Sequence, residues 1–180
     1  MPTYLQTDGI DDRIYFPSMT FTRIDVDAAL YTRAWASIIM VENILEWYRN
    51  EANNGDIQEG SFSRFVDNIE NNFITSGTRH VFSMRLSAPL TGLIDIFCSR
   101  AYGDMQQSEI HDIKVYNGDT LISHIDMTTG TIIDQTGNGN NAILEGGTWI
   151  GDGPQGNTYT KTFSESVVLS EVVRKRTTKR

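Results

Sequence analysis

Met19-Thr20-Phe21-Thr22-Arg23-Ile24-Asp25-Val26-Asp27 is the stretch that indicates the fold most clearly. Apolar and polar residues alternate along it, which is the pattern of a β-strand with one face in a core and the other in solvent. Residues 93–97 and 110–116 alternate in the same way, and residues 34–42 and 80–86 are rich in strand-forming side chains. Short strands at this spacing predict an all-β fold, an antiparallel β-sandwich.

Turn signals separate these predicted strands. Asn117-Gly118-Asp119 predicts a hairpin turn, because Asn-Gly readily supplies positive φ, and residues 120–125 form the returning strand. Pro17-Ser18 is a turn pair just ahead of the opening stretch. Pro89 and Gly92 interrupt the chain after the strand predicted at residues 80–86.

Two segments fit the strand pattern less well. Residues 43–52 contain good helix formers and could form a short helix. Residues 62–73 have two competing interpretations, because five apolar residues there have helical spacing: Phe62, Phe65, Val66, Ile69 and Phe73. The alternative is a strand over residues 62–66 followed by an Asp67-Asn68 turn. We favour the strand, because it agrees with the rest of the chain.

Length and composition describe an ordinary globular domain. The chain has 180 residues, 39% hydrophobic and 21% charged, which suits one domain with a real core. No apolar run approaches the roughly 20 residues that cross a bilayer, so we expect no membrane insertion. The first residues lack the pattern of a secretion signal, which predicts a protein that stays in the cytosol or leaves by lysis. The single cysteine, Cys98, is expected to be a buried apolar residue.

Charge is unevenly distributed along the chain. Five of the 15 basic residues and none of the 23 acidic residues lie in the last seven positions, so residues 1–173 hold 10 basic against 23 acidic residues, a net charge of about −13. Such an acidic body repels nucleic acid and anionic membranes, so no nucleic-acid partner is expected. The basic end could contact an acidic partner, including another copy of this chain.

The chain divides into a predicted sandwich domain, residues 1–153, and an extended C-terminal arm, residues 154–180. Near the end of the first part, a Gly- and Asn-rich loop precedes a short strand, a turn and the aromatic anchor Trp149. Beyond it, residues 158–173 are rich in Ser, Thr and Val and alternate, as in a strand that pairs outside the core. The residues expected to make the arm's assembly contacts are Tyr159, Phe163, Val167, Leu169, Arg174, Lys175 and Arg176.

Two motifs resemble the laminin-G-like, or concanavalin-A-like, jelly-roll family. Leu5-Gln6-Thr7-Asp8-Gly9-Ile10-Asp11-Asp12-Arg13-Ile14 resembles an opening strand of these domains, with its Asp-Gly-x-Asp-Asp turn. Asp134-Gln135-Thr136-Gly137-Asn138-Gly139-Asn140-Asn141, with Leu144 and Trp149 after it, resembles their Asp-x-Ser-Gly-Asn-Gly-Asn segment. Between them, residues 64–68 and 79–81 resemble the middle strands, although Asn68 departs from the family's usual glycine. The resemblance covers about residues 4–152 and implies a lectin-like jelly roll.

The order of the two motifs departs from the family. In most relatives the Gly-Asn-Gly-Asn segment comes before Asp-Gly-x-Asp-Asp, whereas here it comes last, which circular permutation would explain. The permuted layout with a trailing arm resembles domains of bacteriophage structural proteins. The resemblance therefore implies a virion protein, assembled in the host cytoplasm.

Carboxylates in the two motifs are candidate metal ligands. Asp8, Asp11 and Asp12 could bind Ca²⁺ with loop carbonyls, because hard cations prefer oxygen, and Asp134 could join them if the chain ends meet. The alternative, which we favour, is that Asp8 and Asp134 cap turns while the Asn and Gly residues adopt left-handed conformations. Apart from this possible Ca²⁺, no cofactor is expected.

A surface glycan is the ligand that the family resemblance implies. Trp35, Trp47, Tyr48 and Tyr102 are candidates for an aromatic platform, the last three being the predicted glycan contacts. The alternative places Trp35 in the core and Trp149 over an edge of the sandwich. No phosphate loop or nucleophile elbow is present, and the three histidines lack ligand spacing, so we predict that the protein is not an enzyme.

Two functions follow as hypotheses. The first is a phage structural protein, a surface decoration or appendage subunit whose arm docks onto neighbouring virion subunits, including copies of itself. The second is a carbohydrate-binding module for host attachment, at a tail tip or on a cell surface. It depends on the family resemblance alone, and fold is a weak guide to function.

Overall fold

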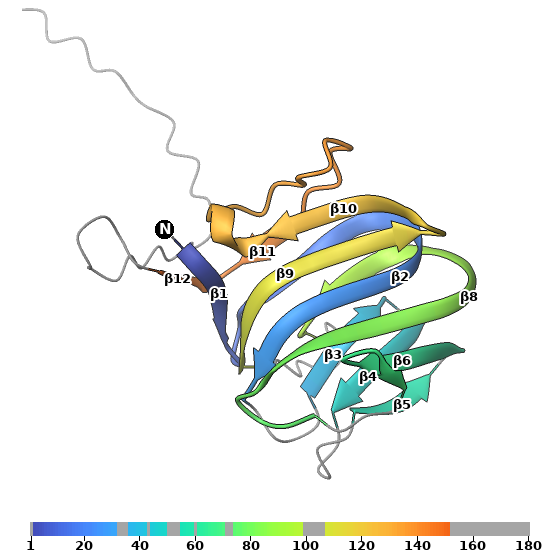
Figure 1. The fold of residues 1–180 in the computed structure, drawn as a ribbon, viewed down its shortest axis with the longest axis horizontal. Coiled ribbons are helices and arrows are strands. Elements are labelled where there is room, and N and C mark those ends of the chain that lie inside the picture. The colour runs from blue at the N-terminus through green and yellow to red at the C-terminus, as the bar shows by residue number, and fades with distance from the viewer. Residues whose placement is uncertain are drawn as a thin grey trace, which may run out of the picture.

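The computed structural model describes residues 2–31, 36–42, 44–49, 55–59, 61–70, 74–98 and 107–151. These residues form twelve β-strands and one 3₁₀ turn, with no α-helix among them (Figure 1). The elements are β1 (Pro2–Asp8), β2 (Arg13–Leu30), β3 (Ala36–Val41), β4 (Leu45–Arg49), β5 (Gly55–Glu59), β6 (Phe62–Val66), β7 (Ile69–Glu70), β8 (Arg79–Ile96), β9 (Gln107–Asn117), β10 (Thr120–Asp126), η1 (Met127–Thr129), β11 (Ile143–Glu145) and β12 (Thr148–Gly151). The predicted all-β fold is confirmed. In this part of the chain no helix could span a membrane.

β2 and β8 organise the sandwich. Each has 18 residues, and they pair antiparallel from Ile14 opposite Ile96 to Ala29 opposite Arg79. Register shifts near Phe16 and Phe21 bend this long ribbon, so that both strands contribute to two layers. One layer follows the order β11-β2-β8-β3-β4-β5, and the other follows β6-β8-β2-β9, with β10 and the pair β1-β12 beside β9 (Figure 1).

The core lies between the two layers. Alternate residues of β2, such as Ile24 and Val26, point inward and are fully buried. Phe82 of β8 joins the layers, because its ring contacts Trp47 of β4 at 6.0 Å and Phe97 at 6.3 Å between centroids. The largest fully buried side chains are Trp47, Phe16, Phe21, Phe82 and Phe97. Cys98 is buried as expected.

Two hairpin turns agree with the sequence prediction. Val66 pairs with Ile69 across Asp67 and Asn68, which have φ of 54° and 64°, as a type I′ turn requires. The strand predicted at residues 62–66 is therefore confirmed, and the helical alternative is wrong there. In the second hairpin Asn117 ends β9 and Gly118, with φ of 59°, takes the first turn position.

Two local predictions are wrong. The short helix considered for residues 43–52 is replaced, in its described part, by β4, because pairing with β3 buries Trp47 completely and this outweighs helix propensity. Pro17-Ser18 does not end a strand but lies in a bulge inside β2, between Phe16 and Met19. A bulge tolerates proline because the extra residue leaves the ladder of backbone hydrogen bonds.

Candidate functional site

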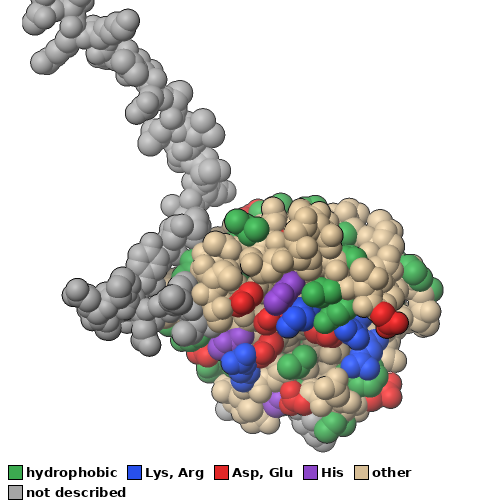
Figure 2. Space-filling view, turned by 45° about the horizontal axis from the view of Figure 1, so that its top comes forward, with side chains coloured by type: hydrophobic (Ala, Val, Ile, Leu, Met, Phe, Trp, Pro, Cys, Tyr) green, Lys and Arg blue, Asp and Glu red, His purple; other side chains and the backbone are tan. Residues whose placement is uncertain are grey.

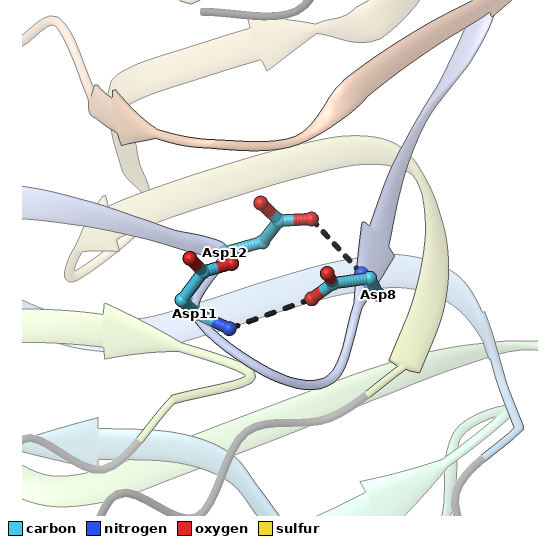
Figure 3. A group of neighbouring side chains, drawn as sticks. All are labelled: Asp8, Asp11 and Asp12. Atoms are coloured by element: carbon cyan, nitrogen blue, oxygen red, sulfur yellow. Dashed lines mark hydrogen bonds between the residues drawn. The ribbon is translucent and has the colours of Figure 1, made fainter. Parts of the chain in front are cut away.

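Asp8, Asp11 and Asp12 lie together in the turn between β1 and β2 (Figure 3). One oxygen of each carboxylate lies within 4.8 Å of the other two. Backbone amides already use several of the oxygens. Asp8 Oδ1 accepts hydrogen bonds from the amides of Ile10 (2.7 Å) and Asp11 (3.4 Å), and Asp12 Oδ2 accepts one from the Asp8 amide at 2.9 Å.

Asp12 also joins two distant turns. Its Oδ1 accepts a hydrogen bond from the Gly147 amide at 2.5 Å, which ties the β1–β2 turn to the turn between β11 and β12. Burial raises the pKa of Asp12, as do the charges of Asp8 and Asp11, while its two amide hydrogen bonds oppose the rise. Gly146 cannot carry a side chain here, because a Cβ would overlap the Asp12 carboxylate and its φ is +73°.

The three aspartates fit a structural role better than a calcium site. Ca²⁺ takes about six to eight oxygen ligands. Both oxygens of Asp12 and one of Asp8 already accept amide hydrogen bonds, so these two carboxylates have a clear role in holding the turn. The turn-capping alternative from the sequence is therefore the one that the geometry favours.

Replacing Asp12 with alanine tests this role. We expect the free energy of unfolding to fall by about 1 to 3 kcal/mol, because the part-buried Gly147 amide loses its acceptor. Chemical denaturation of the purified chain measures the change, with Asp11→Ala as the matched control, expected to stay within about 0.5 kcal/mol. Calcium should leave the unfolding midpoint of the wild type unchanged. A calcium-dependent rise that Asp11→Ala abolishes would show that the site is a metal centre.

Asp134 is not in this cluster and has a different role, as an acceptor for backbone amides. It lies after β10 and is 5% exposed. Its Oδ1 accepts hydrogen bonds from the amides of His124 (3.0 Å) and Thr136 (2.9 Å), and its Oδ2 accepts one from the Asn140 amide at 3.1 Å. Burial disfavours its charge, but these hydrogen bonds outweigh burial, so the pKa of Asp134 is lowered. The metal role predicted for Asp134 is not supported by this geometry.

The loop at residues 134–141 caps the outer edge of β10. The His124 amide donates to Asp134, and the His124 carbonyl accepts from the Gln135 amide at 2.8 Å. The Ile122 carbonyl accepts hydrogen bonds from the side-chain amides of Asn138 (3.2 Å) and Asn140 (2.7 Å). The loop thus gives β10 the partners that another strand would supply, which protects an edge from unwanted pairing.

The predicted aromatic platform is only partly described. Trp47 is fully buried against Phe82, so the prediction that it contacts a surface glycan is wrong. Tyr102, Trp35 and the side chain of Tyr48 lie outside the described residues. Trp149 is 2% exposed, as expected of a residue that covers an edge. The predicted arm, residues 154–180 with its contacts from Tyr159 to Arg176, also lies outside the described residues.

Two histidines contact aspartates. His80 Nδ1 lies 2.6 Å from Asp67 Oδ2, and its Nε2 accepts a hydrogen bond from the Thr75 amide at 3.3 Å. His80 therefore holds the β6–β7 turn through Nδ1 and the segment that precedes β8 through Nε2. His124 Nε2 lies 2.9 Å from Asp112, which also pairs with Lys114 at 3.0 Å.

Ion pairs cover the outer face of the layer that contains β9. Arg79 pairs with Asp27, Arg23 with Asp25 and Lys114 with Asp112. Figure 2 shows acidic, basic and histidine side chains intermingled on one side of the molecule. Because the described charges of opposite sign lie side by side, this face offers no large region of one sign to a ligand.

A groove that sequence reasoning missed lies beside this face. It opens where residues 86–89 of β8 stand opposite Thr22 alone, so that β8 leaves β2. Two adjoining hollows of about 330 and 250 Å³ share Ser61, Leu86 and Ser87. Arg85 lines the larger hollow. The signal was Pro89 in a strand, which marks a bulge, but no sequence pattern indicates that a groove forms there.

Comparisons with protein-family models, curated proteins and solved structures each gave no match. The class that the fold defines is an antiparallel β-sandwich, and the likeness to laminin-G-like domains stays a prediction.

Proposed function

We propose that this protein is a non-catalytic structural subunit of a bacteriophage particle that binds neighbouring copies through its C-terminal segment, residues 154–180. The observation that supports the assembly role is the uneven distribution of charge between the body and the C-terminal end. Residues 1–173 hold a net charge of about −13, and the last seven residues hold five basic and no acidic groups. A basic end on an acidic body attracts the body of another copy. The phage setting depends on the permuted layout of the sequence.

The folded body supports this proposal in two ways. The outer edge of β10 is capped by the 134–141 loop, so the body does not offer that edge for strand addition. The described strands of the sandwich end at Gly151, so the 154–180 segment is not needed to complete any of them.

Deleting residues 158–180 tests the proposal. We expect the shortened chain to keep its sandwich and lose self-association, because the attractive basic end is gone while every described strand remains. Sedimentation velocity measures the association state, and circular dichroism checks the fold. Incorporation into the assembled particle should be lost as well.

A full-length chain with an uncharged C-terminal end provides the control. Replacing the five basic residues at positions 174–180 with glutamine keeps the length, and we expect it to weaken association. Association of the wild type should also weaken between 0.1 M and 1 M salt, since salt screens exposed charges. Association that survives both the deletion and high salt would show that the body assembles by itself, and the proposal would be wrong.

A further inference from the structure

The strongest unassigned feature is the groove between β6, β8 and the β3–β4 turn. Its two hollows are contiguous, because Ser61, Leu86 and Ser87 line both. The smaller hollow has apolar walls that include Leu90 and Ile44, and the Ile44 side chain is 42% exposed. An elongated, partly apolar groove of this kind suits an extended peptide segment.

Arg85 gives the larger hollow a positive charge that no described carboxylate pairs with. Its guanidinium stacks over the Phe65 ring at 4.0 Å, and its Nη2 donates to Asn68 Oδ1 at 3.1 Å. No carboxylate among the described side chains lies within ion-pair distance of it. Four other described basic groups contrast with Arg85, because each contacts a carboxylate: Arg13, Arg23, Arg79 and Lys114.

The position of Arg23 adds to the unfavourable electrostatic environment of Arg85. It lies directly opposite Arg85 across the β2–β8 pair, and like charges in that position destabilise a sheet. Arg23 is compensated by Asp25 at 3.3 Å and stacks over Tyr116 at 3.6 Å. Among the described residues, Arg85 contacts the neutral side-chain amide of Asn68 and the ring of Phe65, and no carboxylate. On a body with many more acids than bases, its missing carboxylate is best supplied from outside.

We propose that the groove binds residues 163–173 from the C-terminal segment of a second copy, with a glutamate of that segment paired to Arg85. In an extended chain, residues two apart share a face. One face of the segment then carries Phe163, Glu165 and Val167, and the pattern recurs as Leu169, Glu171 and Val173. Each triplet places a carboxylate between apolar side chains, which complements an arginine between apolar walls.

The positions of β12 and β6 favour a second copy as the source of the segment that fills the groove. β12, the last described strand, and β6, which lines the groove, are on opposite sides of the molecule in Figure 1. A segment that follows β12 therefore meets a neighbour's groove more directly than its own. The inference depends on the proposed function, since it names the surface that receives the arm.

Charge reversal in the full-length chain tests the pairing. Arg85→Glu should raise the dissociation constant for self-association about 10- to 100-fold, as removal of one partner of a close interfacial charge pair does. Glu165→Arg and Glu171→Arg show which triplet binds, because only the paired glutamate should give a similar loss. Arg85→Glu is combined with each glutamate reversal in turn, and the double reversal that includes the paired glutamate should restore most of the association. Sedimentation equilibrium measures the wild type, the three single variants and the two double variants.

Two further variants serve as controls for the charge reversal at Arg85. Arg79→Glu makes the same charge change on the same strand outside the groove and should leave association within about threefold of the wild type. Arg85→Gln, which adds no acid beside Phe65, covers the case in which Arg85→Glu does not fold. If both Arg85 variants associate normally, or if neither double reversal restores association, this inference is wrong. The 158–180 deletion then decides the proposed function independently.

Discussion

Replacing Phe82 with alanine is expected to lower the free energy of unfolding by about 3 to 5 kcal/mol, the usual cost of removing a buried aromatic ring. Phe82 is fully buried on the inner face of β8. Its ring meets Trp47 and Phe97 edge-on, and His80 at 6.1 Å. Phe82 lies in the part of β8 that pairs with β6, and Trp47 lies on β4 in the other layer. The cavity would therefore open at the contact that holds the layers together.

Equilibrium denaturation with urea, followed by tryptophan fluorescence, measures this loss. Trp47 lies against Phe82, so its emission should report on the same contact. Ile10→Ala is the control, because Ile10 is 76% exposed and its truncation should change stability by no more than about 0.5 kcal/mol. A Phe82→Ala chain as stable as the control would mean that the two layers do not pack as described.

Asp134→Ala is expected to have the second largest effect, a loss of about 2 to 4 kcal/mol. The substitution removes the acceptor of the backbone amides of His124, Thr136 and Asn140. Each part-buried donor left without a partner costs about 1 to 3 kcal/mol, although the loop can relax and let water reach some of them. The same change uncovers the edge of β10, so the variant should also aggregate more readily.

Gln135→Ala is the matched control for this loop. The Gln135 side chain donates only to the Ile133 carbonyl on the surface, and its backbone bond to His124 survives the substitution. Thermal unfolding with light scattering measures stability and aggregation together. If Asp134→Ala were as stable and soluble as Gln135→Ala, the capping role of the loop would be wrong.

The lowered pKa of Asp134 gives this prediction a pH dependence. A carboxyl group whose pKa is lower in the folded state contributes stability above its unfolded pKa of about 3.9 and loses it as pH falls through the folded value. The difference in unfolding free energy between wild type and Asp134→Asn should therefore be full at pH 7 and shrink below about pH 4. A difference that stays constant down to pH 2 would contradict the electrostatic part of the argument.

Local sequence patterns predicted much of the fold. Alternation in residues 19–27 and 110–116 placed strands correctly, and Asp67-Asn68 predicted a turn at the right position. These predictions succeeded because side-chain period and turn chemistry depend on near neighbours. The continuity of β2 through Pro17 was missed, because whether a proline ends a strand or forms a bulge depends on the partner strand.

The candidate site was less predictable from local pattern. Asp8, Asp11 and Asp12 are close in sequence, so their closeness in space was expected, but the bond from Asp12 to Gly147 spans 135 positions. Asp134 was a candidate metal ligand beside them, with turn capping as the favoured alternative, and it accepts amides of its own loop and of β10. Its role depends on β10 having no described strand on its outer side, and no local pattern records this.

By itself, the sequence determined that this protein is an acidic, all-β sandwich with a basic end, because alternation and net charge are properties of the chain alone. The tertiary structure decided which polar groups have hydrogen-bond or ion-pair partners. It brought backbone amides into hydrogen-bond contact with Asp12 and Asp134 and buried Trp47 between two layers. It also left Arg85 in a groove without a carboxylate among the described residues. The physical reason is that hydrogen-bond and charge partners come from strands far apart in sequence, and only strand pairing brings them within contact distance.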